Sequence, residues 1–117
     1  MKTKNQELLK KLNKAFAKND ADFVIQQVTD NIRWNVVGDF SVEGKEAFTQ
    51  KLKEMISDEP YELEIHNIIT HGRDAAVNGL MRSTDGNQYA FCDVYKFSAF
   101  KDPKISEMTS YAIEVKS

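Results

Sequence analysis

A change of hydrophobic period partway along the 117-residue chain constrains its fold more than any other feature. In residues 6–17 and 45–57, apolar side chains recur with the spacing of an amphipathic helix. After Pro60 they instead alternate with polar ones through four stretches, at residues 61–71, 75–83, 88–100 and 105–115. Alternation is typical of half-buried strands, and the short turns between the stretches predict an antiparallel meander.

The rest of the chain completes the predicted order α-α-β-α-β-β-β-β. A second short helix is expected over residues 21–28, a strand over 31–38 and a turn over 41–44. Three helices packed on one face of a curved antiparallel sheet make an α+β, cone-shaped roll. We expect residues 1–117 to form one such domain. The space between the helices and the curved sheet suits a small-molecule ligand.

Charge and composition exclude several classes of function. With 16 basic and 18 acidic residues the net charge is −2, whereas nucleic-acid binders normally carry a basic excess. No apolar run approaches the length that spans a membrane. The single cysteine, Cys92, cannot form an internal disulfide, so a cytoplasmic location is expected. His66 and His71 point to opposite faces of a strand, and we predict neither a metal nor a cofactor.

The strand at 88–100 carries the most informative side chains. One face holds a carboxylate flanked by aromatics, in the set Tyr89, Phe91, Asp93, Tyr95 and Phe97. If that face is interior, desolvation raises the pKa of Asp93, and a protonated carboxyl can donate a hydrogen bond to a ligand oxygen. The alternative is a solvent-facing carboxylate or a structural ion pair with Arg33 or Arg82. Trp34, which shares a face with Ile32 and Val36, is expected in the core.

The last strand is apolar on both faces, which a monomer does not explain. One face carries Ile105, Tyr111, Ile113 and Val115, and the other carries Met108, Ser110 and Ala112. A homodimer that packs its sheets back to back would bury the first set.

Four segments, in this order and spacing, resemble the ketosteroid-isomerase-like or SnoaL-like superfamily, which is also called nuclear-transport-factor-type. They are residues 31–38 (NIRWNVVG), 44–48 (GKEAF), 92–97 (CDVYKF) and 104–111 (KISEMTSY). The resemblance covers most of the chain, from about residue 6 to residue 115. It implies the same cone-shaped fold and a dimer. It also places the second set of the last strand, Met108, Ser110 and Ala112, in the cavity. Phe91 and Tyr95, which share the face of Asp93, are then expected in the cavity wall as ligand contacts.

The resemblance also implies roles for individual residues. The steroid isomerases use an Asp on the first strand as the proton base, and Asn35 occupies the matching position when counted back from Gly38. An amide is not a base at neutral pH, so steroid isomerisation by that mechanism is not expected. The first-helix Tyr of the isomerases is also missing, since its position falls near Lys11. Their protonated Asp on the meander is matched by Asp93.

Three hypotheses follow. The favoured one is a small-molecule-binding domain of unknown activity, with an apolar cavity that holds Asp93. The second is an isomerase, cyclase, dehydratase or hydrolase that acts on a small hydrophobic carbonyl or polyketide-like compound. In that enzyme Asp93 is the acid or hydrogen-bond donor, Asn35 orients the ligand and Arg33 supplies a cation. Asn35 can equally be a strand residue bonded to a neighbour, and Arg33 a surface residue. The third hypothesis is a non-catalytic dimeric accessory protein.

Overall fold

The computed structural model describes residues 3–55, 59–99 and 103–116. The elements in chain order are α1 (Lys4–Ala17), α2 (Ala21–Gln26), β1 (Val28–Val36), β2 (Phe40–Glu43), α3 (Lys45–Met55), β3 (Glu62–His71), β4 (Asp74–Arg82), β5 (Gln88–Phe97) and β6 (Ile105–Val115). They form the predicted α+β roll.

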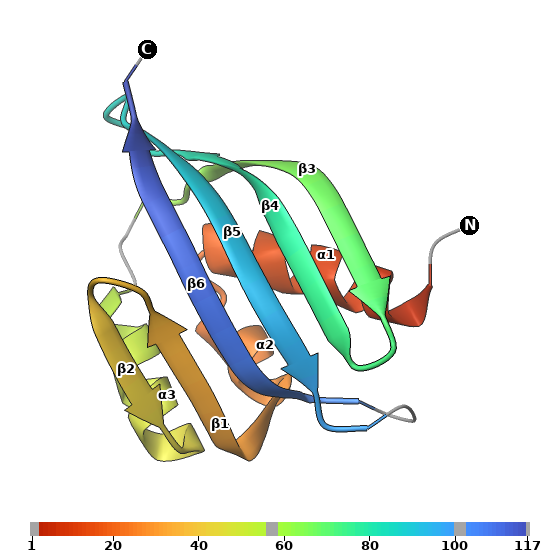
Figure 1. Cartoon of the computed structure of the whole chain (residues 1–117). Helices are drawn as coiled ribbons and strands as arrows, with labels where there is room; N and C mark the ends of the chain where they lie inside the picture. Colours follow the sequence, from red (N-terminus) through yellow and green to blue (C-terminus); the bar gives the residue numbers. More distant parts are fainter. Residues whose placement is uncertain (1–2, 56–58, 100–102, 117) are drawn as a thin grey trace.

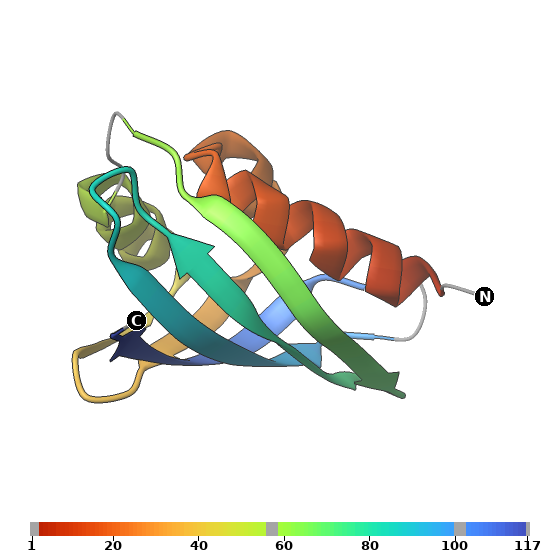
Figure 2. The ribbon, with the colours of Figure 1, turned by 90° about the horizontal axis from the view of Figure 1, so that it is seen from above.

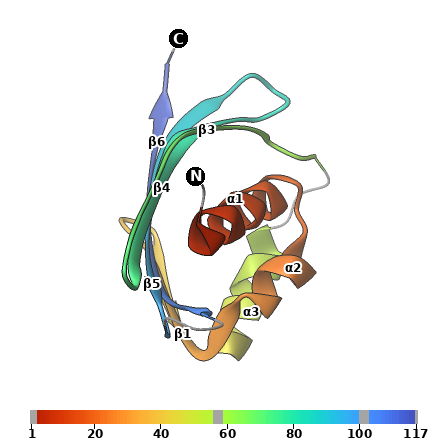
Figure 3. The same ribbon diagram turned by 90° about the vertical axis from the view of Figure 1, so that its right-hand side faces the viewer.

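One curved sheet organises the molecule. Its strand order is β2-β1-β6-β5-β4-β3, and every neighbouring pair is antiparallel except β1 with β6. The three helices of the described residues lie together on the concave side of the sheet, and none of them lies on the other side (Figures 1 and 3). Seen from above, α1 runs alongside β3, the edge strand of the sheet (Figure 2). The predicted meander from β3 to β6 is confirmed.

Local sequence signals set the helix ends. Thr3 and Gln6 form a reciprocal capping box at the start of α1, which satisfies two free backbone N–H groups. Asn19 has a φ of 63°, a left-handed conformation that Asn tolerates, and it turns the chain after α1. The Asp20 side chain then accepts a hydrogen bond from the Phe23 N–H and caps α2.

Trp34 on β1 is the centre of the aromatic core, as predicted. It is 3% exposed, and its ring lies 6.1 Å from that of Phe16, 5.1 Å from that of Phe40 and 5.2 Å from that of Phe48. These contacts join β1 to α1, β2 and α3. Tilted and edge-on ring pairs of this kind stabilise a core beyond their buried area.

Gly79 on β4 allows a close approach by β3. A Cβ atom at this position would lie 2.0 Å from the backbone oxygen of Glu64. The register of β3 against β4 shifts just beyond this contact, between Ile65 and Asn67. Such bulges bend a strand and increase its twist, and here the bend lies in the strand that α1 packs against.

The structure corrects two predictions about the first half of the chain. Residues 41–44 were expected to form a turn, but β2 pairs with β1 there and directs Phe40 and Val42 toward the core. Four residues are too few for alternation to stand out in a sequence. Val28 was expected to end the second helix; it is instead the buried first residue of β1.

Two further corrections concern the later elements. Ile105 was expected on the outer face of the last strand, but it is fully buried, because a bulge in the pairing of β5 with β6 changes the alternation. β5 ends at Phe97, before the predicted residue 100. Residue 100 and the predicted end of the third helix at residues 56–57 lie outside the described residues.

Candidate functional site

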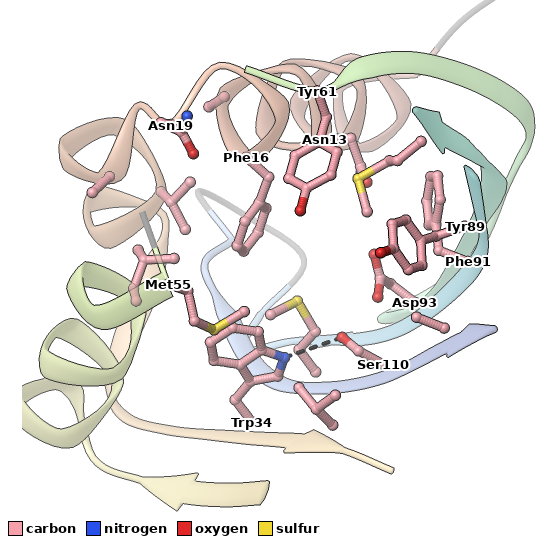
Figure 4. A pocket seen from close by; sticks show the side chains of 18 of the residues that line it. Asn13, Phe16, Asn19, Trp34, Met55, Tyr61, Tyr89, Phe91, Asp93 and Ser110 are labelled. Atoms are coloured by element: carbon pink, nitrogen blue, oxygen red, sulfur yellow. Dashed lines mark hydrogen bonds between the residues drawn. The ribbon is translucent and has the colours of Figure 1, made fainter. Parts of the chain in front are cut away.

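A cavity of about 450 Å³ lies between the helices and the concave face of the sheet. This size is within the usual range for small-molecule sites. Side chains from all three helices and from β1, β4, β5 and β6 reach it, and Figure 4 shows the labelled ones pointing toward a shared space. Most of its wall is apolar, with these aromatic and methionine side chains: Phe16, Trp34, Met55, Tyr61, Met81, Tyr89, Phe91 and Met108.

Asp93 on β5 brings a carboxyl group into this apolar wall. Desolvation by the surrounding protein raises the pKa of Asp93 from 3.8 to about 6, and hydrogen bonds from Ser110 and Tyr95 oppose part of that rise. Among the described residues, no Lys, Arg or His contributes to this pKa. The two arginines considered as structural partners pair elsewhere, Arg33 with Glu43 and Glu107, and Arg82 with Glu62 and Glu64.

One of the two donors to Asp93 comes from beneath the cavity. The Tyr95 hydroxyl is 3.4 Å from Asp93 Oδ2, and Asn13 Nδ2 donates to that hydroxyl over 3.3 Å. The same amide also donates to the backbone oxygen of Leu9 over 2.8 Å. Burial and the neighbouring carboxylate raise the pKa of Tyr95 well above its ordinary value, so Tyr95 stays a neutral donor.

The other donor lies on β6, directly opposite Asp93 in the strand register. Ser110 donates to the carboxylate and accepts a hydrogen bond of 3.1 Å from Trp34 Nε1 (Figure 4). The carboxyl group of Asp93 is therefore the common acceptor of two chains of donors, one from α1 through Tyr95 and one from β1 through Ser110. Such satisfied networks hold a half-buried polar group in one orientation.

The structure brings several of the predicted site residues together. Phe91, Asp93, Met108 and Ala112 all line the cavity, on the inner faces of β5 and β6. Tyr95 is fully buried and does not line the cavity, so it supports Asp93 from behind rather than contacting a ligand.

Arg33 and Asn35 lie elsewhere. Both are exposed on the outer face of β1, because they alternate with the inward-facing Ile32 and Trp34. Arg33 forms ion pairs with Glu43 at 3.2 Å and Glu107 at 3.8 Å on that surface. The expectation that Asn35 orients a ligand beside Asp93, and that Arg33 supplies a cation there, therefore disagrees with the positions of both side chains.

On the inner face of β1, Trp34 and Val36 line the cavity in their place. Neither side chain accepts a proton, so the first strand supplies no base to this site. The first strand therefore supplies no isomerase-type base because Trp34 and Val36 occupy its inner face. The Asn at position 35 is not the reason, since its side chain faces outward.

Sequence reasoning missed several polar residues of the site, among them Asn13 and Tyr61; Asn19, Asp20 and Asp39, which also line the cavity, were expected only as turn or cap residues. Asn13 follows Leu9 and Leu12 on the buried face of α1, and a polar residue on an apolar stripe was the available signal. Tyr61 precedes β3, and its hydroxyl points into the cavity (Figure 4). Its ring makes an edge-on contact with that of Tyr89, with centroids 6.5 Å apart.

The described part of the chain contains neither a cluster of metal ligands nor a helix that could cross a membrane. No group of three or more His, Cys, Asp or Glu side chains in residues 3–55, 59–99 and 103–116 is arranged to hold a metal ion. No helix within those ranges has the length and apolar character needed to cross a membrane.

Comparison with known proteins identifies the family. Residues 9–108 match the SnoaL-like domain. The chain belongs to this family. Proteins with SnoaL-like and NTF2-like domains bind small molecules and include isomerases, cyclases and hydrolases. No curated protein matches the sequence.

Solved structures share the fold of this SnoaL-like domain at low sequence identity. A candidate SnoaL-like polyketide cyclase from Shewanella denitrificans OS-217 has a TM-score of 0.81 at 11% identity, over 96% of this chain and 92% of that one. An LEH-like epoxide hydrolase from M. tuberculosis has a TM-score of 0.72 at 18% identity, over 92% and 80%. An NTF2-like protein of unknown function from Cytophaga hutchinsonii ATCC 33406 has a TM-score of 0.70 at 23% identity, over 92% and 97%. These likenesses show the fold alone.

Proposed function

We propose that this SnoaL-like domain binds a small, largely apolar molecule in the cavity, with Asp93 as the polar contact. The observation that carries the proposal is a carboxyl group with a pKa of about 6 in the wall of a cavity of about 450 Å³. A few polar groups within an apolar cavity are typical of ligand sites. A perturbed pKa in such a cavity is a further mark of a functional group.

A thermal-shift screen of hydrophobic carbonyl compounds tests the proposal. A ligand at about a hundredfold excess over its Kd adds about 2.7 kcal/mol to the free energy of unfolding, which corresponds to a Tm increase of about 10 °C for a domain of this size. Ala112→Phe provides a variant that narrows the cavity while keeping Asp93. We expect hits with the wild type that the Phe variant loses; equal shifts for both proteins would place the binding elsewhere.

An enzymatic role is the second candidate, and the pKa of Asp93 favours it. A pKa of about 6 is close to neutral pH, where a carboxyl group is effective in general acid–base catalysis. We propose an isomerase, cyclase, dehydratase or hydrolase type of reaction on a small hydrophobic carbonyl compound. Asp93→Asn is then expected to remove turnover without unfolding the protein, and retained turnover would exclude Asp93 as the catalytic group.

We also propose that the outer face of the sheet pairs with a second copy of the chain. This face exposes large apolar side chains on β3, β5 and β6, here called the outer patch: Ile69, Val94, Tyr111, Ile113 and Val115. In the register of β5 and β6, Ala90 and Cys92 lie directly beside Ile113 and Tyr111 and extend the patch. Exposed apolar patches on a small domain are typical of interfaces. A dimeric accessory protein without catalysis would use the same face.

A further inference from the structure

The charged side chains in the described lining of the cavity are all acidic. Three acidic side chains line it, namely Asp20, Asp39 and Asp93, while its described lining contains no Lys, Arg or His. Asp20 and Asp39 are exposed and Asp93 is half-buried, so the acidic groups extend from the solvent-facing edge to the inner wall. An anionic ligand would meet like charges there and no compensating cation, and like charges brought together cost free energy.

Aromatic rings face the cavity from two sides. Phe16 and Trp34 form one pair, with centroids 6.1 Å apart, and Tyr61 and Tyr89 form the other, 6.5 Å apart. In Figure 4 these two pairs and Asp93 surround the same space. The face of an aromatic ring attracts a cation, and a set of such rings is a known means of recognising ammonium groups.

The hydrogen bonds of Asp93 favour its charged form. Ser110 and Tyr95 both donate to this carboxyl group, and both interactions lower the pKa of Asp93 against the effect of desolvation. Above pH 6 the group is a carboxylate in an apolar wall, and no described cation neutralises it. A cationic ligand would supply the missing counter-charge, because an ion pair in such surroundings is screened less than one in water.

We infer that the cavity selects a hydrophobic amine, bound as its ammonium ion, over neutral and anionic molecules of the same shape. This inference rests on the proposed small-molecule function and names the ligand class for it. The ammonium group pairs with Asp93 while the hydrocarbon part packs among the aromatic rings and the methionines.

The pH dependence follows from the groups that face Asp93. Tyr95 and Ser110 touch it from β5 and β6, and the Asn13 amide reaches it through Tyr95. The other titratable groups of the cavity lining are Asp20, Asp39, Tyr61 and Tyr89. Tyr111 of the outer patch also borders the cavity, and it pairs in register with Cys92, which adjoins Asp93 on the outer face. Carboxyl, phenol and thiol groups carry no positive charge in any protonation state. The pKa of Asp93 is raised into the range of the test, so Asp93 is expected to dominate the response.

Isothermal titration with three probes of one skeleton tests the inference: naphthylethylamine, naphthylacetamide and naphthylacetate. At about pH 8 we expect the amine to bind about tenfold more tightly than the amide, and the carboxylate to bind most weakly. From about pH 5 to about pH 8 the ionised fraction of Asp93 rises from about a tenth to nearly all, so the amine affinity rises about tenfold. The amide affinity is expected to stay level or to fall.

Variants separate this inference from the proposed function. Asp93→Asn is expected to remove the tenfold preference for the amine and its pH dependence, while amide binding changes by less than about threefold. Asp22→Asn, an exposed carboxyl outside the cavity, is the matched control and is expected to bind like the wild type.

The possible results have distinct meanings. An amide that binds as tightly as the amine at about pH 8, or a carboxylate that binds best, would overturn the amine preference and leave the binding cavity standing. If none of the three probes binds, both the inference and the proposed function fail.

Discussion

Replacement of the Asp93 carboxyl group by the amide of Asn is expected to stabilise the protein, by an amount that depends on pH. The pKa of Asp93 is raised in the folded state from 3.8 to about 6, chiefly by desolvation. As the pH rises, the unfolded chain therefore releases this proton before the folded protein does. The folded state binds more protons than the unfolded state in this range, so Asp93 lowers the stability of the wild type progressively between about pH 4 and about pH 6.

The magnitude follows from the two pKa values. The difference between 3.8 and about 6 corresponds to about 3 kcal/mol in the free energy of unfolding, at about 1.36 kcal/mol per pKa unit. Below about pH 4 the penalty is nearly absent, because the carboxyl group is mostly protonated in both states. The Asn side chain stays neutral throughout, and its amide oxygen can still accept from Ser110 and Tyr95. The variant is thus expected to exceed the wild type in stability by up to about 3 kcal/mol above pH 7.

Urea denaturation followed by the fluorescence of Trp34, the single tryptophan, measures this difference. Both proteins are compared at each pH, because hydrogen bonds lower the pKa values of Glu64, Asp74 and Asp85, with help from nearby cations at Glu64 and Asp74, and make both proteins lose stability in acid. Asp22→Asn controls for the loss of a surface carboxylate. A difference that stays constant with pH, or a wild type that gains stability relative to the variant as pH rises, would refute the reasoning.

Three further predictions concern the groups around this site and the faces of the sheet. Tyr95→Phe removes one donor to Asp93, so an NMR titration is expected to show the pKa of Asp93 above that in the wild type; an unchanged or lower value would contradict the network. Gly79→Ala places a methyl group against the backbone of β3 and is expected to lower the Tm by more than about 5 °C, whereas an unchanged Tm would mean that β3 moves freely. Ile113→Glu puts a charge into the outer patch and is expected to convert a dimer into a monomer by light scattering at micromolar concentration, and a wild type that is already monomeric would remove the proposed interface.

Side-chain alternation predicted most of the sheet and one wall of the cavity. The strand period placed Phe91 and Asp93 on one face of β5, and the resemblance to the superfamily then placed Met108 and Ala112 in the cavity. The structure has all four on the inner side. Pairing of β1 with β6 in parallel, by contrast, joins segments that are far apart in the chain, and no local pattern reports it.

The misplaced residues have a specific physical cause. Asn35 was assigned to the cavity by counting back from Gly38, although Trp34 beside it was expected in the core. Adjacent residues of a strand face opposite ways, so one assignment excluded the other. The alternation of side chains along the strand gave the correct placement, with Trp34 inside and Asn35 outside. The hydrogen bonds that link Asn13 through Tyr95 to Asp93 could not be predicted from local sequence patterns, because Asn13 and Tyr95 are 82 positions apart in the sequence.

A carbon NMR titration of the Asp93 carboxyl group, with and without naphthylethylamine, is the most direct test of the role of Asp93 in the cavity. A pKa of about 6 is expected in the free protein, since the cavity wall desolvates this group. A lower pKa is expected with the amine bound, because an ammonium ion stabilises the carboxylate. A free-protein pKa at or below 3.8, or a pKa that the amine leaves unchanged, would contradict the role given to Asp93 in the cavity.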